Sequence, residues 1–455
     1  MEQALPLRQK TLNFTKIVIP ILVTQVALYM MTFFDILMTG RYHTHDLAGV
    51  TIGSSFWVPV YTGLSGILMG LTPLIAHYIG GNRKNEVRPS VQQGLYVSIV
   101  LAAVVFTIMM FAVIPSLQHM PLEGQVRIVA ADYLKGMSIG LLPLFAYTVL
   151  RSFFDALGST RVSMSIILLS APINIVLNYL LIFGKFGFPE LGGAGAGYAS
   201  GITYWIVFGI AFVIAKMRKP FQTFTLFTNW ERVSFNRWKE ILKIGLPIGL
   251  SIFVEISIFS VVTLLMSGYS TETISAHQIA LNFTSLLYMV PLSISMGATI
   301  LVGQSVGARQ MNEAKHYSFL AVGLAVLFSF ISIVILLTFR EPIASLYTSD
   351  KAIIQLSVHF FLFAAFFQLS DAIQAPIQGS LRGYKDVNMT FLMAIISYWV
   401  IGLPVGYLTA TYTDLGPYGY WVGLIAGLTI GAITLSIRLL QIQKRNSAKN
   451  KTREA

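Results

Sequence analysis

Apolar runs of about 20 residues recur along the whole chain, and this feature limits the possible fold more than any other. A run of that length is what a helix needs to cross the hydrocarbon core of a bilayer. Of the 455 residues, 55% are hydrophobic and only 11% are charged. A soluble domain carries about 25% charged residues, and a transmembrane barrel would show short alternating segments instead. The sequence therefore predicts an all-α integral membrane protein.

The chain has room for about twelve spanning helices. At its start, Arg8, Lys10 and Lys16 precede an apolar stretch that is too long for a signal-peptide core, so we interpret this stretch as the first span. The expected spans run roughly over residues 14–39, 48–79, 91–114, 127–157, 162–185, 193–216, 236–267, 275–306, 318–339, 350–381, 388–410 and 417–441.

The basic residues indicate the topology. With the N-terminus inside, most Lys and Arg residues fall in the inner segments, among them Arg83, Lys84, Arg382 and Lys385. The positive-inside rule then places both termini in the cytoplasm. We expect the membrane to be the plasma (inner) membrane. The net charge of +12 is therefore explained by topology, and we expect no nucleic-acid partner. We expect the polar tail after Gln443 to be disordered.

The two halves of the chain resemble each other at an offset of about 227, which falls to about 222 near the end. Pro20 matches Pro247, Tyr61 matches Tyr288, and Gly70 matches Gly297. Six helices per half make a parallel repeat, which predicts two six-helix bundles around a central cavity. The expected divisions are an N-terminal lobe (1–215), a cytoplasmic linker (216–236), a C-terminal lobe (237–443) and a basic cytoplasmic tail (444–455).

Pro20 and Pro247 each lie well inside the first apolar run of their half. An internal proline removes a backbone hydrogen bond and can kink a helix. Neighbouring helices can relieve such a kink. Two interpretations stay open, a tolerated kink or a hinge that bends during transport.

Glu255 and Asp371 are single acids inside long apolar segments. A charged acid near the bilayer centre costs roughly 2.5–3.5 kcal/mol, so such a residue usually faces a cavity and handles a proton, a cation or a substrate. Both lie about 16–18 Å from the cytoplasmic edge at 1.5 Å per residue, and neither helix offers a basic residue in its core. Two neighbouring carboxylates would share a sodium ion, or one would hold a proton. Protonated acids in ordinary interhelical hydrogen bonds are the alternative.

Asp35 marks a second polar position, in the outer half of the first span. Asn174 and Asn178 are spaced four apart and so share one helix face. An acid with two amides could bind a cation, a proton or a substrate amine, and a self-satisfied polar cluster is the alternative.

Aromatic and polar residues near the acids are candidates for the substrate cavity. Phe259 follows Glu255 by four residues, so the two share a face on which an organic cation could rest. Packed or lipid-facing aromatic residues are the alternative. Asp350 lies at an outer helix start, where a helix N-terminus favours an acid, and Arg151 lies four residues before Asp155. The remaining candidates for the cavity are Gln278, Tyr288 and Phe367.

Several classes of chemistry find no support in the sequence. The chain has no cysteine, so a disulfide framework, a thiolate metal site and a cysteine nucleophile are excluded. The seven histidines show no zinc-ligand spacing, and no GxxxxGK[ST] loop is present. We see no nucleophile–base motif either. We therefore expect no enzyme activity and no cofactor.

Five segments together resemble the multidrug and toxic compound extrusion (MATE) family, in its NorM-type branch. They are LYMMTFFDILMTG, PIGLSIFVEISIF, SAHQIALN, FQLSDAIQ and MGATILVGQSVGAR. The resemblance covers nearly the whole chain and implies an exporter of cationic amphipathic drugs that is driven by inward sodium or proton flow. It also implies a twelve-helix membrane protein with no nucleic-acid partner, which we expect to be monomeric and to confer antibiotic resistance.

The resemblance carries over to particular residues. Glu255 and Asp371 match the cation-site acids of the second lobe, Asp35 matches the first-lobe acid, and Phe259 and Gln278 match cavity positions. Phe367 stands where some relatives have a tyrosine oxygen, and Ser349-Asp350 stands where some have an acidic pair. The alternative function is a flippase of related fold for a lipid-linked saccharide, but a flippase would need a basic cavity. An intramembrane enzyme or a channel fits less well.

Overall fold

The computed structural model describes residues 6–454, with side chains through Asn446 and at Ala448. The regular structure in this range is helical. Of the described helices, 11 are long and apolar enough to cross a membrane, or 12 if one bent pair counts as a single span. The prediction of an all-α polytopic membrane protein is therefore confirmed, and the expected spans correspond to helices of the structure.

The described chain forms two compact units, which we name the N unit (Val23–Gly249) and the C unit (Met1–Leu22 with Leu250–Ala455). Helices α1 and α10 are shared between them, because the divisions fall inside both. The shared helices are α1 (Leu7–Tyr42) and α10 (Phe235–Leu265).

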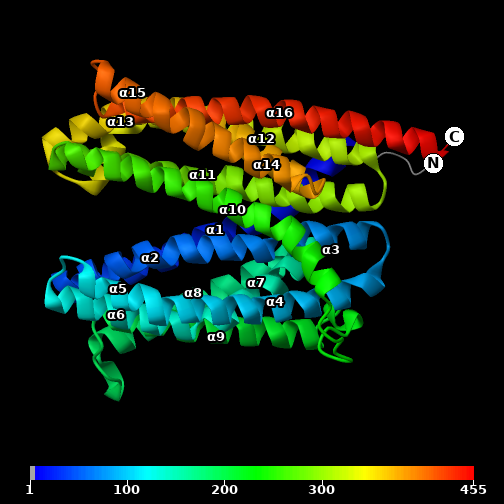
Figure 1. Ribbon diagram of the computed structural model, residues 1–455, viewed down its shortest axis with the longest axis horizontal. Helices are drawn as coiled ribbons and strands as arrows, with labels where there is room; N and C mark the ends of the chain where they lie inside the picture. The colour runs from blue at the N-terminus through cyan, green and yellow to red at the C-terminus, as the bar shows by residue number, and fades with distance from the viewer. Residues whose placement is uncertain (1–5, 455) are drawn as a thin grey trace. The chain divides into compact units, whose positions relative to one another are not determined.

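The N unit consists of long helices that pack side by side, with α6 against α9 and α2, and α8 against α9 (Figure 1). Its elements are α2 (Thr44–Met69), α3 (Leu71–Gly80), η1 (Lys84–Glu86), α4 (Val87–Ile108), η2 (Met109–Val113), α5 (Ile114–Ser116), η3 (Leu117–His119), α6 (Gly124–Ile139), α7 (Leu141–Ala156), α8 (Thr160–Phe183), η4 (Lys185–Gly187), α9 (Gly193–Met217) and η5 (Phe221–Phe224).

The C unit is built around α13, which packs against α11, α12 and α16. Figure 1 shows these helices as long, roughly parallel rods. Its elements are η6 (Met266–Gly268), α11 (Thr271–Gly307), α12 (Met311–Tyr347), α13 (Lys351–Gly383), α14 (Val387–Ala394), the π-helical η7 (Ile395–Gly402), α15 (Leu403–Tyr412) and α16 (Tyr418–Glu454).

The divisions between the units fall after Leu22 and Gly249, two residues beyond Pro20 and Pro247 respectively. These are matching positions of the internal repeat. The boundary between the units therefore falls at the same place in α1 as in α10, the first helix of each half. The units thus divide inside α1 and α10 rather than in segment 216–236, which we expected to link the lobes.

Segment 216–236 belongs to the N unit because two fully buried glutamines of α4 hold it there. The Gln92 amide donates to the carbonyls of Leu226 and Thr228, at 2.8 and 3.1 Å. The Gln93 amide donates to the carbonyl of Arg232 at 2.9 Å, and its oxygen accepts from the Ser234 amide at 3.0 Å. Side-chain amides thus satisfy an irregular backbone segment that would otherwise leave polar groups unpaired.

Two ion pairs hold the amino-terminal parts of α1 and α10. In the C unit, Lys10 pairs with Glu313 at 2.9 Å; in the N unit, Arg237 pairs with Glu86 at 3.0 Å. Lys10 also approaches the His316 ring at 3.4 Å. Each member of one pair matches a member of the other at the repeat offset of about 227. The duplication has therefore kept the same contact in both units.

Two details differ from the expectation. The span expected over 127–157 bends by 47° between α6 and α7, whereas the span expected over 48–79 is present as Thr44–Gly80. The expectation of a disordered tail is wrong for residues 444–454, because α16 continues as a helix to Glu454. The tail contains Lys, Arg, Ala and Glu, which are good helix formers, and an existing helix extends without a new nucleation cost.

In the C unit, a glycine allows two helices to approach each other closely. A Cβ on Gly379 of α13 would lie 2.1 Å from the carbonyl oxygen of Ser295 on α11. Only glycine therefore lets α13 lie this close to α11, and this contact adjoins the site described next.

Candidate functional site

In the N unit, Asp35 of α1 meets the amides that the sequence singled out on α8. The Asn178 amide donates to Asp35 Oδ1 at 2.5 Å and to Asn174 Oδ1 at 3.1 Å. Both asparagines are fully buried, and Asp35 is half-buried. The structure thus brings together all three residues of the predicted first-lobe site.

Helix α9 completes this first cluster with two hydroxyls that the sequence analysis missed. Ser200 Oγ donates to Asp35 Oδ2 at 3.3 Å, and the Asn174 amide donates to Ser200 and Thr203, each at 3.4 Å. Asn178 Oδ1 is buried without a hydrogen-bond partner. The cluster therefore offers one free acceptor beside an acid, which suits a proton or a cation.

In the C unit, α13 carries a polar stripe through its apolar sequence. Asp371, Gln374, Gln378 and Arg382 follow at spacings of three, four and four, so they lie on one face of the helix. All four are buried. The facing acid is Glu255 of α10, whose Oε1 accepts from the Gln378 amide at 2.5 Å.

The two acids lie close enough for their charges to interact, and both interact with the Tyr288 hydroxyl of α11. A second tyrosine, Tyr398 of η7, accepts a hydrogen bond from Gln374 at 2.9 Å and interacts with both acids. Glu255 of α10 thus contacts the stripe of α13 that also carries Asp371, and the role of both acids in a shared site stays a prediction.

Several polar atoms of this interior have no partner among the described residues. They are both side-chain atoms of Gln368, the Gln374 Oε1, the Ser397 Oγ and the Arg382 Nε. Buried polar groups are nearly always paired, so such atoms indicate water or an ion. Carboxylate and amide oxygens are also the ligands that a hard cation prefers. The donor set therefore fits sodium as well as a proton. Among the described residues, no group of three or more His, Asp or Glu side chains could hold a metal ion.

Arg382 corrects one expectation. The sequence analysis placed it among the cytoplasmic charges and found no basic residue to accompany the acids, but its side chain is only 7% exposed and its charge interacts with that of Glu255. The long arginine side chain reaches from the last turn of α13 into the polar interior.

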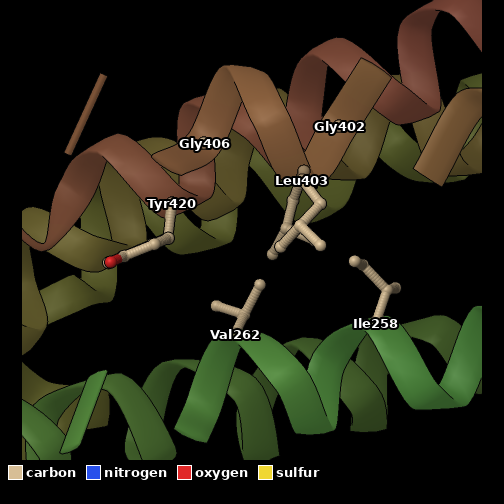
Figure 2. A pocket seen from close by; sticks show the side chains of 7 residues that line it. Ile258, Val262, Gly402, Leu403, Gly406 and Tyr420 are labelled. Atoms are coloured by element: carbon tan, nitrogen blue, oxygen red, sulfur yellow. The ribbon is translucent and has the colours of Figure 1, made fainter. Parts of the chain in front are cut away.

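The predicted aromatic residues lie beside the acids. The rings of Phe259 and Phe367 meet edge to face with centroids 6.0 Å apart, and Phe259 is one turn beyond Glu255 on α10. Further along the same face of α10, Ile258 and Val262 line an apolar pocket opposite α15 and α16 (Figure 2). Its lining carries no charged group, so it offers apolar surface and no ligand for an ion.

Two predicted substrate residues are not brought to the acids. Gln278 precedes Tyr288 by ten residues on α11, about 15 Å along the helix, and Asp350 precedes Asp371 by 21 residues on α13, roughly 30 Å. Asp350 instead caps α13, and its Oδ1 accepts from the Ala352 amide at 2.8 Å. This contact agrees with the expectation that a helix N-terminus favours an acid at this position.

The Arg151–Asp155 pair that the sequence suggested is present at 3.4 Å, and Ser163 also donates to Asp155 at 2.8 Å. These contacts satisfy Asp155 without a ligand.

Comparison with known proteins supports this architecture. The chain matches the MatE family over residues 20–180 and 247–408, two stretches whose starts repeat the offset between Pro20 and Pro247. The chain belongs to the MATE family. This is a family of transporters rather than enzymes, as the sequence predicted.

Curated relatives in the family match over full length. A probable multidrug resistance protein NorM of Oceanobacillus iheyensis is 52% identical over 98% of this chain and 100% of its own. The protein of the same name from Bacillus subtilis is 51% identical over 99% of both chains. These identities confirm the resemblance to the NorM-type branch.

Solved structures share the fold at lower identity. An outward-facing multidrug resistance MATE family transporter aligns with a TM-score of 0.87 and 19% identity over 97% of both chains. The eukaryotic MATE transporter AtDTX14 aligns with a TM-score of 0.84 and 20% identity over 98% of this chain and 99% of its own. The predicted fold is thus confirmed as that of MATE transporters in a multi-pass membrane protein.

The sequence analysis missed most of the stripe on α13. Gln374, Gln378 and Arg382 carry a signal that could have been found, since polar residues recur at helical spacing after Asp371 in an otherwise apolar helix. Ser200 and Thr203 carry less signal, because hydroxyls are common in spanning helices and satisfy themselves on their own backbone.

Proposed function

We propose that this protein is a secondary active transporter that expels amphipathic organic cations from the cell in exchange for sodium ions or protons. The observation that carries the proposal is Glu255, which is held by Gln378 against the buried polar stripe that carries Asp371, in an interior that also holds unpartnered polar atoms. An acid inside a membrane is retained where it handles a charge.

The surroundings of the acids support an organic cation as the substrate. The paired rings of Phe259 and Phe367 lie beside Glu255 and offer an aromatic face, which attracts cations. The names of the curated relatives point to drugs as their substrates. The first cluster, around Asp35, supplies a second acid for a cation or a proton.

The fold by itself does not choose the substrate. One solved relative, a transporter from Pyrococcus furiosus with a TM-score of 0.85, is described as having a binding pocket of reversed polarity that suggests a different function. In this chain the clusters hold three acids, Asp35, Glu255 and Asp371, against one buried arginine. That excess of acids favours cationic substrates over an anionic lipid-linked saccharide.

The mechanism is competition between the drug and the coupling ion. In the outward-facing state, sodium or a proton binds at Glu255 and Asp371, neutralises them and weakens the hold on the drug. When the ion leaves on the cytoplasmic side, the charge returns and with it the affinity for drug. The lobes 1–215 and 237–443 alternate between states open to the cytoplasm and open to the outside, with both termini in the cytoplasm. The coupling is limited by the difference in ion affinity between the states. The working unit is a monomer.

The test uses purified protein in liposomes loaded with a fluorescent organic cation. We expect an imposed sodium or pH gradient to drive efflux, and Glu255→Gln and Asp371→Asn each to abolish the gradient dependence. Asp414→Asn, an exposed loop acid of the same unit, is the matched control and retains efflux. Normal gradient-driven efflux by both site variants would show the proposal to be wrong.

A further inference from the structure

Arg382 is a buried cation that nothing yet accounts for. Its side chain is 7% exposed, and its Nε has no hydrogen-bond partner. Burying an arginine is costly unless opposite charges and acceptors compensate it. Its position therefore requires a negative partner in the interior of the C unit.

Glu255 is that partner, but the two do not touch. The Gln378 amide holds Glu255 at 2.5 Å, and Gln378 lies one turn before Arg382 on the same face of α13. No ion pair within 4.0 Å joins Arg382 to an acid among the described residues, yet its charge interacts with that of Glu255. The arginine thus lies near the acid, and its Nε–H has no acceptor among the described residues.

The charges of this interior can be counted. Glu255 and Asp371 contribute two negative charges when ionised, and Arg382 contributes one positive charge. The other titratable groups that interact with them are the hydroxyls of Tyr288 on α11 and Tyr398 on η7, which are neutral at physiological pH.

The neighbouring helices add no further charge at this depth. The acids and bases of α12 lie near its two ends, and Arg438 of α16 is paired with Asp386 at 2.6 Å. The interior of the C unit therefore carries one net negative charge when both acids are ionised.

The internal repeat shows that the two acids and the arginine are all specific to the second half of the chain. At the offset of 227, Glu255 corresponds to Leu28; along α13 the offset is 225, as for Gly383 and Gly158, so Asp371 corresponds to Ala146 and Arg382 to Leu157. The amides of the stripe are also replaced, with Gln374 matching Val149 and Gln378 matching Phe153. The first half has an apolar residue at every one of these positions. The arginine is thus part of the same specialisation as the two acids and not a packing device that the fold requires.

We propose that Arg382 is the internal counter-cation of the Glu255–Asp371 site, and that it limits the site to one monovalent cation or one proton per cycle. This inference rests on the proposed function. Arg382 is a positioning residue, since it acts on the ion through the acids. By compensating one carboxylate permanently, it keeps the site from holding an ion too tightly to release it in the cytoplasm.

The test replaces Arg382 and measures ion dependence. Arg382→Gln leaves two uncompensated acids, so we expect the half-saturating concentration of the coupling ion to fall by about tenfold or more. That is the effect of one unit charge several ångströms away at an effective dielectric constant of about 20. The maximal efflux rate should fall as well, because release slows. Arg382→Lys keeps the charge and should retain the wild-type ion dependence.

Arg438→Gln is the matched control, because it removes another arginine–carboxylate pair of the same unit, outside the site. It should leave the ion dependence unchanged. A folded Arg382→Gln protein with the wild-type half-saturating concentration would overturn the inference. If Arg382→Gln fails to fold, Arg382→Lys decides: loss of ion dependence in the lysine variant would equally overturn it.

Sodium binding at several pH values, measured by calorimetry on the detergent-purified protein, separates this inference from the proposed function. If the wild type binds the ion and Arg382→Gln binds it more tightly, the counter-cation role holds even where no drug efflux is found. If wild-type efflux is ion-driven and Arg382→Gln binds the ion as tightly as the wild type does, only the inference fails.

Discussion

The two repeat-related ion pairs should differ in strength, because they differ in burial. The side chains of Lys10 and Glu313 are 5% and 16% exposed, whereas those of Arg237 and Glu86 are 28% and 34% exposed. Glu313→Gln leaves the buried charge of Lys10 without its acidic partner. We expect this to lower the free energy of unfolding by about 3 kcal/mol, the lower end for a broken buried pair. We choose the lower end because His316 remains near Lys10.

Glu86→Gln breaks the corresponding exposed pair, which is worth about 0.2–1 kcal/mol. The difference of about 2 kcal/mol or more corresponds to roughly 4 °C or more in the thermal midpoint for a unit of about 200 residues. Both variants change one carboxylate to an amide at matching positions of the repeat, so each is the control of the other.

The assay compares thermal midpoints of the purified proteins in one detergent, at low and at high salt. Glu313→Gln should lower the midpoint in both buffers. The smaller effect of Glu86→Gln should shrink further at high salt, because an exposed pair is screened. Equal destabilisation by the two variants, or a larger effect of Glu86→Gln, would refute the argument from burial.

Three further variants test other parts of the structure. Asp35→Asn removes the acid of the first cluster but keeps an acceptor for Asn178; we expect dye efflux from cells to fall while the thermal midpoint stays within a few degrees. Gln92→Leu loses the hydrogen bonds to the segment 216–236, so we expect it to become sensitive to limited proteolysis; unchanged cleavage would contradict this. Gly379→Ala places a Cβ against α11 and should prevent folding, as judged by gel filtration, whereas Gly323→Ala, with no atom within 4 Å of the added Cβ, should behave as wild type.

Much of the fold follows from the sequence, because the bilayer leaves few choices. Apolar runs of spanning length must form helices, since only helices satisfy their own backbone in lipid. The constant repeat offset then implies two related halves. The bend between α6 and α7 could not be predicted, because it depends on tertiary packing rather than on the hydropathy of the run.

The candidate site was predictable only in part, for a physical reason. Glu255, Asp371 and Asp35 stand out because an acid in an apolar run is costly and therefore rare. Glutamine costs less to bury, so Gln374 and Gln378 stand out less in an apolar run. Arg382 was assigned to the cytoplasm by its place near a helix end, since hydropathy does not show which way a long side chain extends.

The most direct test of the account is the binding of a fluorescent organic cation to the purified protein, titrated against sodium and against protons. The account predicts competition: the coupling ion weakens drug binding, drug weakens ion binding by the same factor, and Glu255→Gln with Asp371→Asn removes the effect. Drug affinity that does not change with sodium or pH in the wild-type protein would contradict it.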